Sequence, residues 1–332
     1  MAKMKYFYDL TISSSPHVHS PVTTQTIMRD VLIALAPALV GSVCIFGFRA
    51  LLVTLVSAAA CVFFEWAYCR IAKTHCKIYD LSAVVTGVLL AFVCPVTIPY
   101  WCIILGDFFA IVVVKQLFGG IGRNIVNPAL AARAFMFSYP ALMTRWVAPG
   151  FGNAAGIFST ADAVTAATPL ADMSLGNLPS ATVGQLFLGN VGGCIGETSA
   201  LLLLVGLVYL LARKVITLRI PLSFIGTVAV LTLIFPQGNG NFTWMLSQLF
   251  AGGLFLGAIF MATDYVTSPL THLGQIVFGI GCGVLTVVIR YFGGYPEGVS
   301  YAILIMNICV VLLDRIGRPR KFGAPKKEVA KK

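Results

Sequence analysis

Charged side chains are scarce in this chain. Asp, Glu, Lys and Arg make up only 11% of its 332 residues, and 58% of the residues are hydrophobic, whereas soluble domains contain about 25% charged residues. So little charge excludes an ordinary soluble domain and predicts an all-α polytopic membrane protein with about ten transmembrane helices. The net charge of +11 comes from basic residues at the ends of apolar runs and in the C-terminal tail. This distribution favours membrane lipid, and not nucleic acid, as a partner.

Two other features are missing. The nine cysteines form no CxxC pair and no Cys/His cluster, which argues against an iron–sulfur cluster held by this chain alone. The first 21 residues, MAKMKYFYDLTISSSPHVHSP, have a basic start but no apolar core and no small-residue cleavage site. The first apolar run is therefore expected to be a retained membrane span.

Ten apolar runs can be marked along the chain, and several are shorter than the roughly 20 residues of a full span. The third and fifth runs contain proline or many alanines, which is typical of broken or re-entrant helices that other protein segments cover. The runs lie at residues 30–47, 51–69, 81–98, 100–117, 125–139, 198–212, 220–236, 242–262, 273–290 and 299–314.

The basic residues predict the orientation. If the N-terminus is cytoplasmic and the runs alternate, nineteen of the 23 Lys and Arg residues lie inside and only Arg49, Arg145 and Arg290 lie outside. Both termini are then cytoplasmic, and a polar segment in the middle of the chain is extracytoplasmic. The predicted parts are a cytoplasmic segment (1–28), a first five-helix repeat (29–139), the extracytoplasmic segment (140–197), a second five-helix repeat (198–314) and a basic cytoplasmic tail (315–332).

The two five-helix parts resemble each other. KQLFGGIGRNIVNPALAARAF at 115–135 and VIRYFGGYPEGVSYAILIMNI at 288–308 both have Phe-Gly-Gly between two apolar runs. Duplication of an odd number of spans inverts the second copy, so the sequence predicts two inverted repeats. Broken helices in inverted repeats are also typical of secondary transporters, which leaves that class open.

The extracytoplasmic segment contains the motif D-x-x-T-x-A-T, formed by Asp162, Thr165, Ala167 and Thr168. The small residues leave room for a bulky group beside the Thr168 hydroxyl, which can be esterified to a phosphate. A nearby carboxylate is suited to binding the Mg²⁺ that such a transfer needs. An ordinary loop with Asp and Thr helix caps explains the same residues without any cofactor.

This motif resembles the flavinylation motif of a family of redox-driven ion pumps. The family contains the B subunit of the Na⁺-translocating NADH:quinone oxidoreductase and the D subunit of the Rnf complex. The resemblance implies FMN bound covalently through a phosphoester to Thr168, attached by a separate flavin transferase that uses FAD. Asp162, Thr165 and Ala167 complete the flavinylation motif, and Asp162 is expected to be recognised by the transferase. The chain has Ala166 where many members have Gly. A second Ala-Thr pair, at Thr182, has no Asp at the matching position.

Further segments carry the same resemblance over nearly the whole chain. They include SPHVHSPVTTQTIMRDVLIALAPAL near the N-terminus, DLSAVVTGVLLAFVCPVTIPYW at 80–101, FGGIGRNIVNPALAARAF at 118–135 and MATDYVTSPLT at 261–271. The chain length and the lack of a long N-terminal extension favour the Rnf branch, with the quinone-reductase branch as the alternative.

A second candidate site combines Asn124, Asn127 and Asp264. The two asparagines flank the start of the fifth apolar run, where a helix N-terminus offers free N–H groups and two amides can pair with the polar edge of an isoalloxazine ring. Asn-capping of a half-helix is the simpler alternative. Asp264 lies at a membrane boundary, where a carboxylate should face a cavity, cofactor or partner. The resemblance implies non-covalent riboflavin near the cytoplasmic side, so we assign all three to it, with cation handling as a competing role for Asp264.

Three more charged residues, Glu65, Asp107 and Arg133, lie in or beside apolar runs. Such residues are functional candidates because burying a charge in a membrane is costly. A buried pair between Asp107 and Arg133 is expected if the fourth and fifth runs pack together.

The resemblance implies an integral inner-membrane flavin subunit of a prokaryotic Rnf-type complex, which relays electrons between ferredoxin and NAD⁺ while Na⁺ or H⁺ is translocated. The protein places the flavins and the cofactors carry the chemistry, so the chain is not expected to be active alone. The implied partners are iron–sulfur, flavin and membrane subunits of the complex. D-x-x-T-x-A-T separates this hypothesis from a secondary transporter, which needs no such motif.

Overall fold

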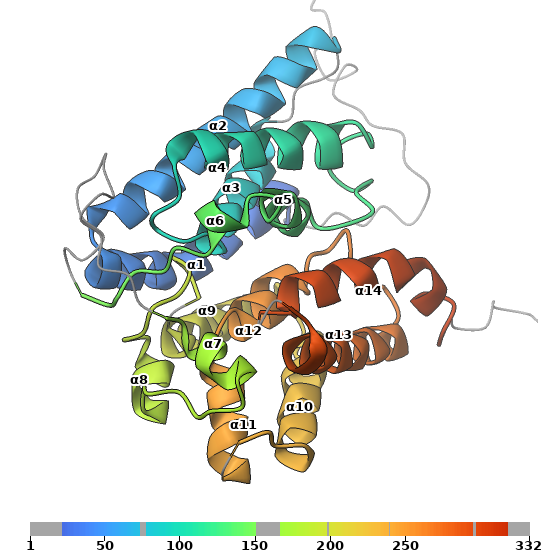
Figure 1. Ribbon diagram of the computed structural model, residues 1–332. Coiled ribbons are helices and arrows are strands. Elements are labelled where there is room, and N and C mark those ends of the chain that lie inside the picture. Colours follow the sequence, from blue (N-terminus) through green and yellow to red (C-terminus); the bar gives the residue numbers. More distant parts are fainter. Residues whose placement is uncertain are drawn as a thin grey trace, which may run out of the picture.

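The computed structural model describes residues 22–73, 78–150, 167–197, 199–238, 240–294 and 297–317, and every regular element in these ranges is a helix. Figure 1 shows two groups of helices, one built from the N-terminal part of the chain and one from the C-terminal part. The first group contains α1 (Thr24–Phe46), α2 (Phe48–Ile71), the short η2 (Ile78–Asp80), α3 (Ser82–Phe92), α4 (Tyr100–Phe108), which continues as the π-helix η3 (Phe109–Gln116), α5 (Pro128–Met136) and α6 (Pro140–Met143).

The second group follows two short helices that lie in the middle of the chain. These two are α7 (Pro169–Ser174) and α8 (Val183–Leu188). The group itself consists of α9 (Ala200–Ala212), α10 (Arg219–Ile234), α11 (Asn241–Phe250), α12 (Leu254–Leu256), which continues as the π-helix η4 (Gly257–Met261), α13 (His272–Phe292) and α14 (Val299–Leu313).

Three helices, α1, α2 and α13, are long and apolar enough to cross a membrane. A fourth span is formed if α11 is joined to the segment Leu254–Met261, from which it is bent by 61°. The prediction of an all-helical protein with apolar spans is therefore confirmed, and each of the ten apolar runs contains a helix. That all ten cross the membrane, in two inverted repeats, stays a prediction.

The third and fifth runs form short helices, as the sequence indicated. Helix α3 has 11 residues and α5 has nine. Pro95 lies just beyond α3, and α5 begins at Pro128, whose ring has no N–H to lose at a first helical turn. Both helices are too short to cross a bilayer alone.

Two buried arginines bind backbone carbonyls where the helical path is interrupted, one after α3 and one between α11 and α12. Arg49 of α2 donates from Nε to the Val96 carbonyl (2.8 Å) and from Nη2 to the Ile98 carbonyl (3.2 Å), just after α3. Arg290 of α13 donates to the carbonyls of Gln248 and Ala251 at the end of α11. Carbonyl groups that lie outside regular helix need such partners in a membrane, because no water reaches them there.

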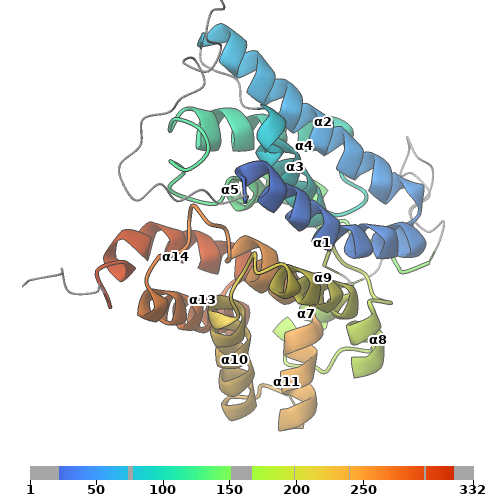
Figure 2. The same cartoon turned by 180° about the vertical axis from the view of Figure 1, so that it is seen from behind.

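The helices pack in a similar order in both groups. Helix α2 lies against α3 and α4, and α10 lies against α11 and α13. The groups are joined through α1 with α9 and through α5 with α14, as seen from both sides in Figures 1 and 2.

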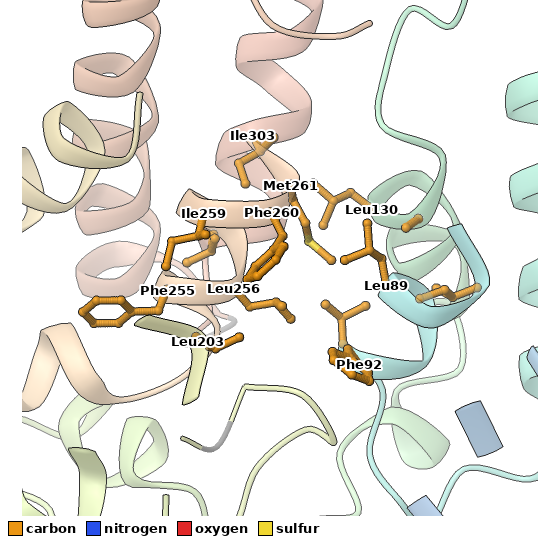
Figure 3. Packing of buried hydrophobic residues seen from close by; sticks show 14 of the residues in the cluster. Leu89, Phe92, Leu130, Leu203, Phe255, Leu256, Ile259, Phe260, Met261 and Ile303 are labelled. Atoms are coloured by element: carbon orange, nitrogen blue, oxygen red, sulfur yellow. The ribbon is translucent and has the colours of Figure 1, made fainter. Parts of the chain in front are cut away.

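The hydrophobic core continues across the contact between the two groups. Figure 3 shows side chains of α3 and α5 facing side chains of α12, η4 and α14. Because lipid is as apolar as these side chains, close packing stabilises the contact more than exclusion of water does. The residues labelled there are Leu89, Phe92 and Leu130 on one side and Leu203, Phe255, Leu256, Ile259, Phe260, Met261 and Ile303 on the other.

Candidate functional site

Two cavities lie where segments from both groups of helices meet. The first, here the asparagine cavity, has a volume of about 80 Å³ and is lined by Asn124, Asn127 and Asp264 among others. The three residues predicted to form the second flavin site thus border one space. Apolar side chains of α1, α3 and η4 form part of the remaining wall.

Asn127 is held firmly at the N-terminus of α5. Its side-chain oxygen accepts from the N–H groups of Ala129 (3.0 Å) and Leu130 (3.4 Å), and its amide nitrogen donates to the Met261 carbonyl at the end of η4 (3.3 Å). The capping alternative is therefore correct for this side chain. One amide hydrogen remains for a ligand, because the amide has two.

Asn307 of α14 reinforces this junction. Oriented so that its oxygen accepts from the Asn127 backbone N–H, its nitrogen donates to the Thr267 carbonyl, each at 3.1 Å. The residue is only 3% exposed. It was not among the sequence candidates, because one asparagine within an apolar run gives no pattern to find it by.

Asn124 contributes a buried polar atom without a hydrogen-bond partner to the asparagine cavity. This atom is its side-chain oxygen. A buried acceptor without a donor costs about 1–3 kcal/mol, so a ligand that brings an N–H group to this oxygen would be stabilised. A flavin ring carries such a group on its pyrimidine edge, so the Asn124 oxygen is a suitable acceptor for that edge of the predicted cofactor.

Asp264 faces the same cavity from the loop after η4. Its carboxylate accepts from the Thr267 hydroxyl at 3.1 Å. Desolvation raises the pKa of the Asp264 carboxyl, against hydrogen bonds from Thr267 and from the N–H groups of Val266 and Tyr265, which lower it. A carboxyl in this position can accept a hydrogen bond from a ligand or hold a cation.

Lys115 brings a positive charge to the wall of the asparagine cavity. Its ammonium lies 2.8 Å from Glu65 Oε1 and donates to the Ser82 hydroxyl at 2.6 Å. Both charged side chains are about 95% buried or more, so the pair is a fixed dipole between α2 and η3. Glu65, predicted only as a candidate charge, is thereby assigned as the partner of Lys115.

The second space, here the threonine cavity, has a volume of about 240 Å³. Thr168 lies in its wall, together with segments from α5, α11 and the loops before α9 and α14. Aromatic side chains and glycine backbone make up much of the remaining lining, and both leave flat surfaces that suit a planar ring. These lining residues are Phe137, Trp146, Phe250, Gly192, Gly193 and Gly252.

The two Ala-Thr candidates differ in how their hydroxyl groups are used. Thr168 precedes α7, and its side chain makes no capping hydrogen bond. Thr182 precedes α8, and its hydroxyl accepts from the Gln185 N–H in a capping box. Thr168 also borders the threonine cavity. The preference for Thr168 therefore has a structural basis, because its oxygen is free for another bond.

The rest of the predicted motif is only partly described. Asp162 and Thr165 lie outside the described residues, and Ala167 is exposed beside Thr168. Their predicted role in recognition by a flavin transferase stays a prediction.

Two acidic residues that the sequence did not single out also line the threonine cavity, Glu197 and Glu297. Arg133, which is 2% exposed, pairs with Glu297 through Nη2 and donates from Nη1 to the Ser300 hydroxyl at 2.8 Å. The expected pair between Asp107 and Arg133 is wrong. Asp107 instead accepts from Ser57 (2.7 Å) and Cys61 (3.2 Å) of α2.

The physical reason is the direction of the two side chains. Helix α4 presents Asp107 to α2, where two donors face it, while α5 presents Arg133 to α14 of the other helix group. An ion pair predicted only from neighbouring apolar runs does not take into account contacts with the other helix group.

An all-helical fold with apolar spans, interrupted helices and two cavities between its helix groups is that of an integral membrane protein. Residues 11–323 match the NQR2, RnfD, RnfE family, and the chain belongs to this family.

Relatives of named function match over nearly their full length. The D subunit of the Na⁺-translocating ferredoxin:NAD⁺ oxidoreductase complex of Acetobacterium woodii is 43% identical over 321 residues, which cover 96% of each chain. The D subunit of the proton-translocating ferredoxin:NAD⁺ oxidoreductase complex of Clostridium ljungdahlii is 44% identical over 324 residues, 94% of this chain and 96% of that one. The D subunit of the ion-translocating oxidoreductase complex of Stutzerimonas stutzeri is 38% identical, over 90% of this chain and 91% of the relative.

Proposed function

We propose that this chain is the membrane flavin subunit of an Rnf-type complex, which passes electrons between ferredoxin and NAD⁺ and translocates Na⁺ or H⁺. The observation that carries the proposal is the Thr168 hydroxyl, which makes no capping bond and borders a cavity of about 240 Å³. FMN is attached there by a phosphoester, which a flavin transferase forms. The similarity to the D subunits of ferredoxin:NAD⁺ oxidoreductases supports the assignment.

Riboflavin occupies the asparagine cavity in this proposal. Asn124 offers an unpaired buried oxygen and Asn127 one remaining amide hydrogen, so the two side chains match a donor and an acceptor on the polar edge of the ring. Asp264 lies at the same wall. The flavin supplies the redox chemistry, and these residues hold and orient it.

The two flavins form successive stations. Gly252 borders the threonine cavity and Ile259 the asparagine cavity, and the helical segment between them spans about 10 Å at 1.5 Å per residue. Electrons enter and leave through partner subunits that contain iron–sulfur clusters and a further flavin, so the chain is not active alone. The threonine cavity is extracytoplasmic, and both termini are cytoplasmic.

The proposed inverted repeat agrees with this arrangement. Helices α2 and α10 have corresponding neighbours, and each group of helices contributes an interrupted segment whose freed carbonyls an arginine covers. A transporter with inverted repeats has the same features, but family membership and the free Thr168 hydroxyl argue against that class.

Flavin quantification tests the proposal. The complex is purified from a host that has the flavin transferase and is then precipitated with acid. We expect covalent flavin in the pellet band of this chain and non-covalent riboflavin in the supernatant. A pellet without flavin in this chain would reject the proposed function.

Asn124→Ala tests the second flavin separately. We expect the riboflavin affinity to fall up to about tenfold, because one hydrogen bond is lost, while the covalent flavin in the pellet is unchanged. Asn177→Ala, at an exposed position, is the control and should leave both flavins in place. Equal riboflavin affinity in wild type and Asn124→Ala would remove Asn124 from this site.

A further inference from the structure

Two carboxylates of the threonine cavity each have an oxygen without a partner. Glu197 Oε2 and Glu297 Oε1 are buried and accept no hydrogen bond, although both residues line the cavity. Glu197 is only 6% exposed. An uncompensated buried carboxylate oxygen is costly, so these two atoms indicate a ligand that donates hydrogen bonds.

The other oxygen of each carboxylate is fixed. Glu197 Oε1 accepts from the Cys194 backbone N–H at 3.3 Å, and Glu297 Oε2 is bound by Arg133. Arg133 is in turn held by Ser300 and lies over the Phe137 ring, 5.5 Å from its centroid. The free oxygens therefore have defined positions instead of belonging to mobile surface side chains.

The free oxygens converge beside Gly253. A Cβ atom on this residue would overlap Glu197 Oε2 and would lie 3.5 Å from Glu297 Oε1. Both oxygens thus lie within 3.5 Å of one point, which only a residue without a side chain leaves open. The glycine allows the carboxylates to approach the interruption between α11 and α12.

An N–H donor fits these oxygens better than a metal ion does. The ligand atoms of Cys194, Glu197 and Glu297 lie within 4.8 Å of one another. However, the Cys194 thiol donates to the Val93 carbonyl (3.2 Å) and is therefore protonated, and Arg133 already neutralises Glu297. Coordination of a cation would require both interactions to be given up. A neutral donor requires neither.

We propose, building on the function assigned above, that Glu197 accepts the imide N–H of the covalent flavin ring, with Glu297, which Arg133 binds, beside it. The pyrimidine edge of a flavin presents one N–H between two carbonyl groups, and within this cavity the free oxygen of Glu197 is suited to receive that single hydrogen. Glu197 is thus a positioning residue that also places a negative charge next to the ring.

That charge lowers the reduction potential of the ring. An added electron on the flavin is repelled by a nearby carboxylate, and the low dielectric of a buried site strengthens the repulsion. Tuning of a flavin by the charge beside its ring is one of the protein's main means of controlling it.

Three variants test this assignment in the purified complex. Glu197→Gln keeps an acceptor but removes the charge, and Glu197→Ala removes both. We expect both variants to favour the reduced flavin by about tenfold, or about 59 mV for a one-electron couple. Glu197→Ala should also lower the fluorescence anisotropy of the ring, because the acceptor is lost. Asp172→Asn, four residues beyond Thr168 and outside the cavity lining, is the control for a distant charge.

In-gel fluorescence separates the two hypotheses. The role of Glu197 would be overturned if the band is fluorescent while the flavin potential and anisotropy of the purified complex are unchanged in both Glu197 variants. That result would leave the proposed function intact. A dark wild-type band would overturn both. Gly253→Ala provides an independent variant if the Glu197 variants do not assemble, because its methyl group displaces the Glu197 carboxylate. It should shift the potential in the same direction, and an unchanged potential would again contradict the role of Glu197.

Discussion

Thr168→Ala should abolish covalent flavin in this chain completely. The proposed phosphoester needs the side-chain oxygen of residue 168, and alanine has none. The measurement is flavin fluorescence of the band for this chain after denaturing electrophoresis. Because the Thr168 hydroxyl makes no capping bond to α7, the change removes the attachment atom without removing a bond that stabilises the fold. The free energy of unfolding should therefore remain nearly unchanged.

Thr182→Ala is the matched control. It removes a hydroxyl in the same Ala-Thr context, but that hydroxyl belongs to the capping box of α8. We expect full fluorescence together with a loss of about 1 kcal/mol of stability, the usual effect of removing a cap. The two variants thus have opposite signatures, one losing the flavin and the other losing stability.

Thr168→Ser adds a graded test, because serine keeps the oxygen and loses only a methyl group. Fluorescence that survives in Thr168→Ser and vanishes in Thr168→Ala would identify the hydroxyl as the attachment point. Fluorescence that persists in Thr168→Ala would place the flavin on another residue and contradict the assignment.

The sequence predicted the helices well because apolar runs in a membrane protein have few alternatives. Backbone groups in lipid must be satisfied within the segment, so an apolar run becomes a helix or an interrupted helix. The prolines in the third run and the Asn127-Pro128 pair in the fifth run correctly indicated that these runs form short helices, α3 and α5. The length of an apolar run does not predict the angle between two helical segments within it, such as the 61° bend between α11 and Leu254–Met261.

The candidate sites were predicted in part. Asn124, Asn127 and Asp264 could be grouped because they lie at related ends of the two halves, and they do line one cavity. Glu197 and Glu297 were missed, since each is a single acidic residue in a loop, and their meeting depends on the tertiary fold. The same reason explains the wrong partner for Arg133, whose ion pair joins residues 164 positions apart.

Arg133→Met should destabilise the protein strongly. The guanidinium is almost fully buried, binds Glu297 and Ser300, and contacts the Phe137 ring. Methionine fills part of the volume but leaves the Glu297 carboxylate without its counter-charge, and removing one partner of a buried pair costs roughly 3–5 kcal/mol. The loss should appear as a large decrease in the midpoint of thermal unfolding, measured on the detergent-solubilised complex.

A second change separates loss of packing from loss of charge. In the double variant Arg133→Met/Glu297→Gln the buried carboxylate is neutral, so much of the stability lost in the single variant should return, because the unpaired charge causes most of the cost. Arg133→Lys should lie between wild type and Arg133→Met, since an ammonium restores the charge but not the two-directional hydrogen bonding to Glu297 and Ser300. A double variant no more stable than Arg133→Met would mean that Arg133 acts through shape alone. The ion pair would then not be what joins α5 to the segment before α14.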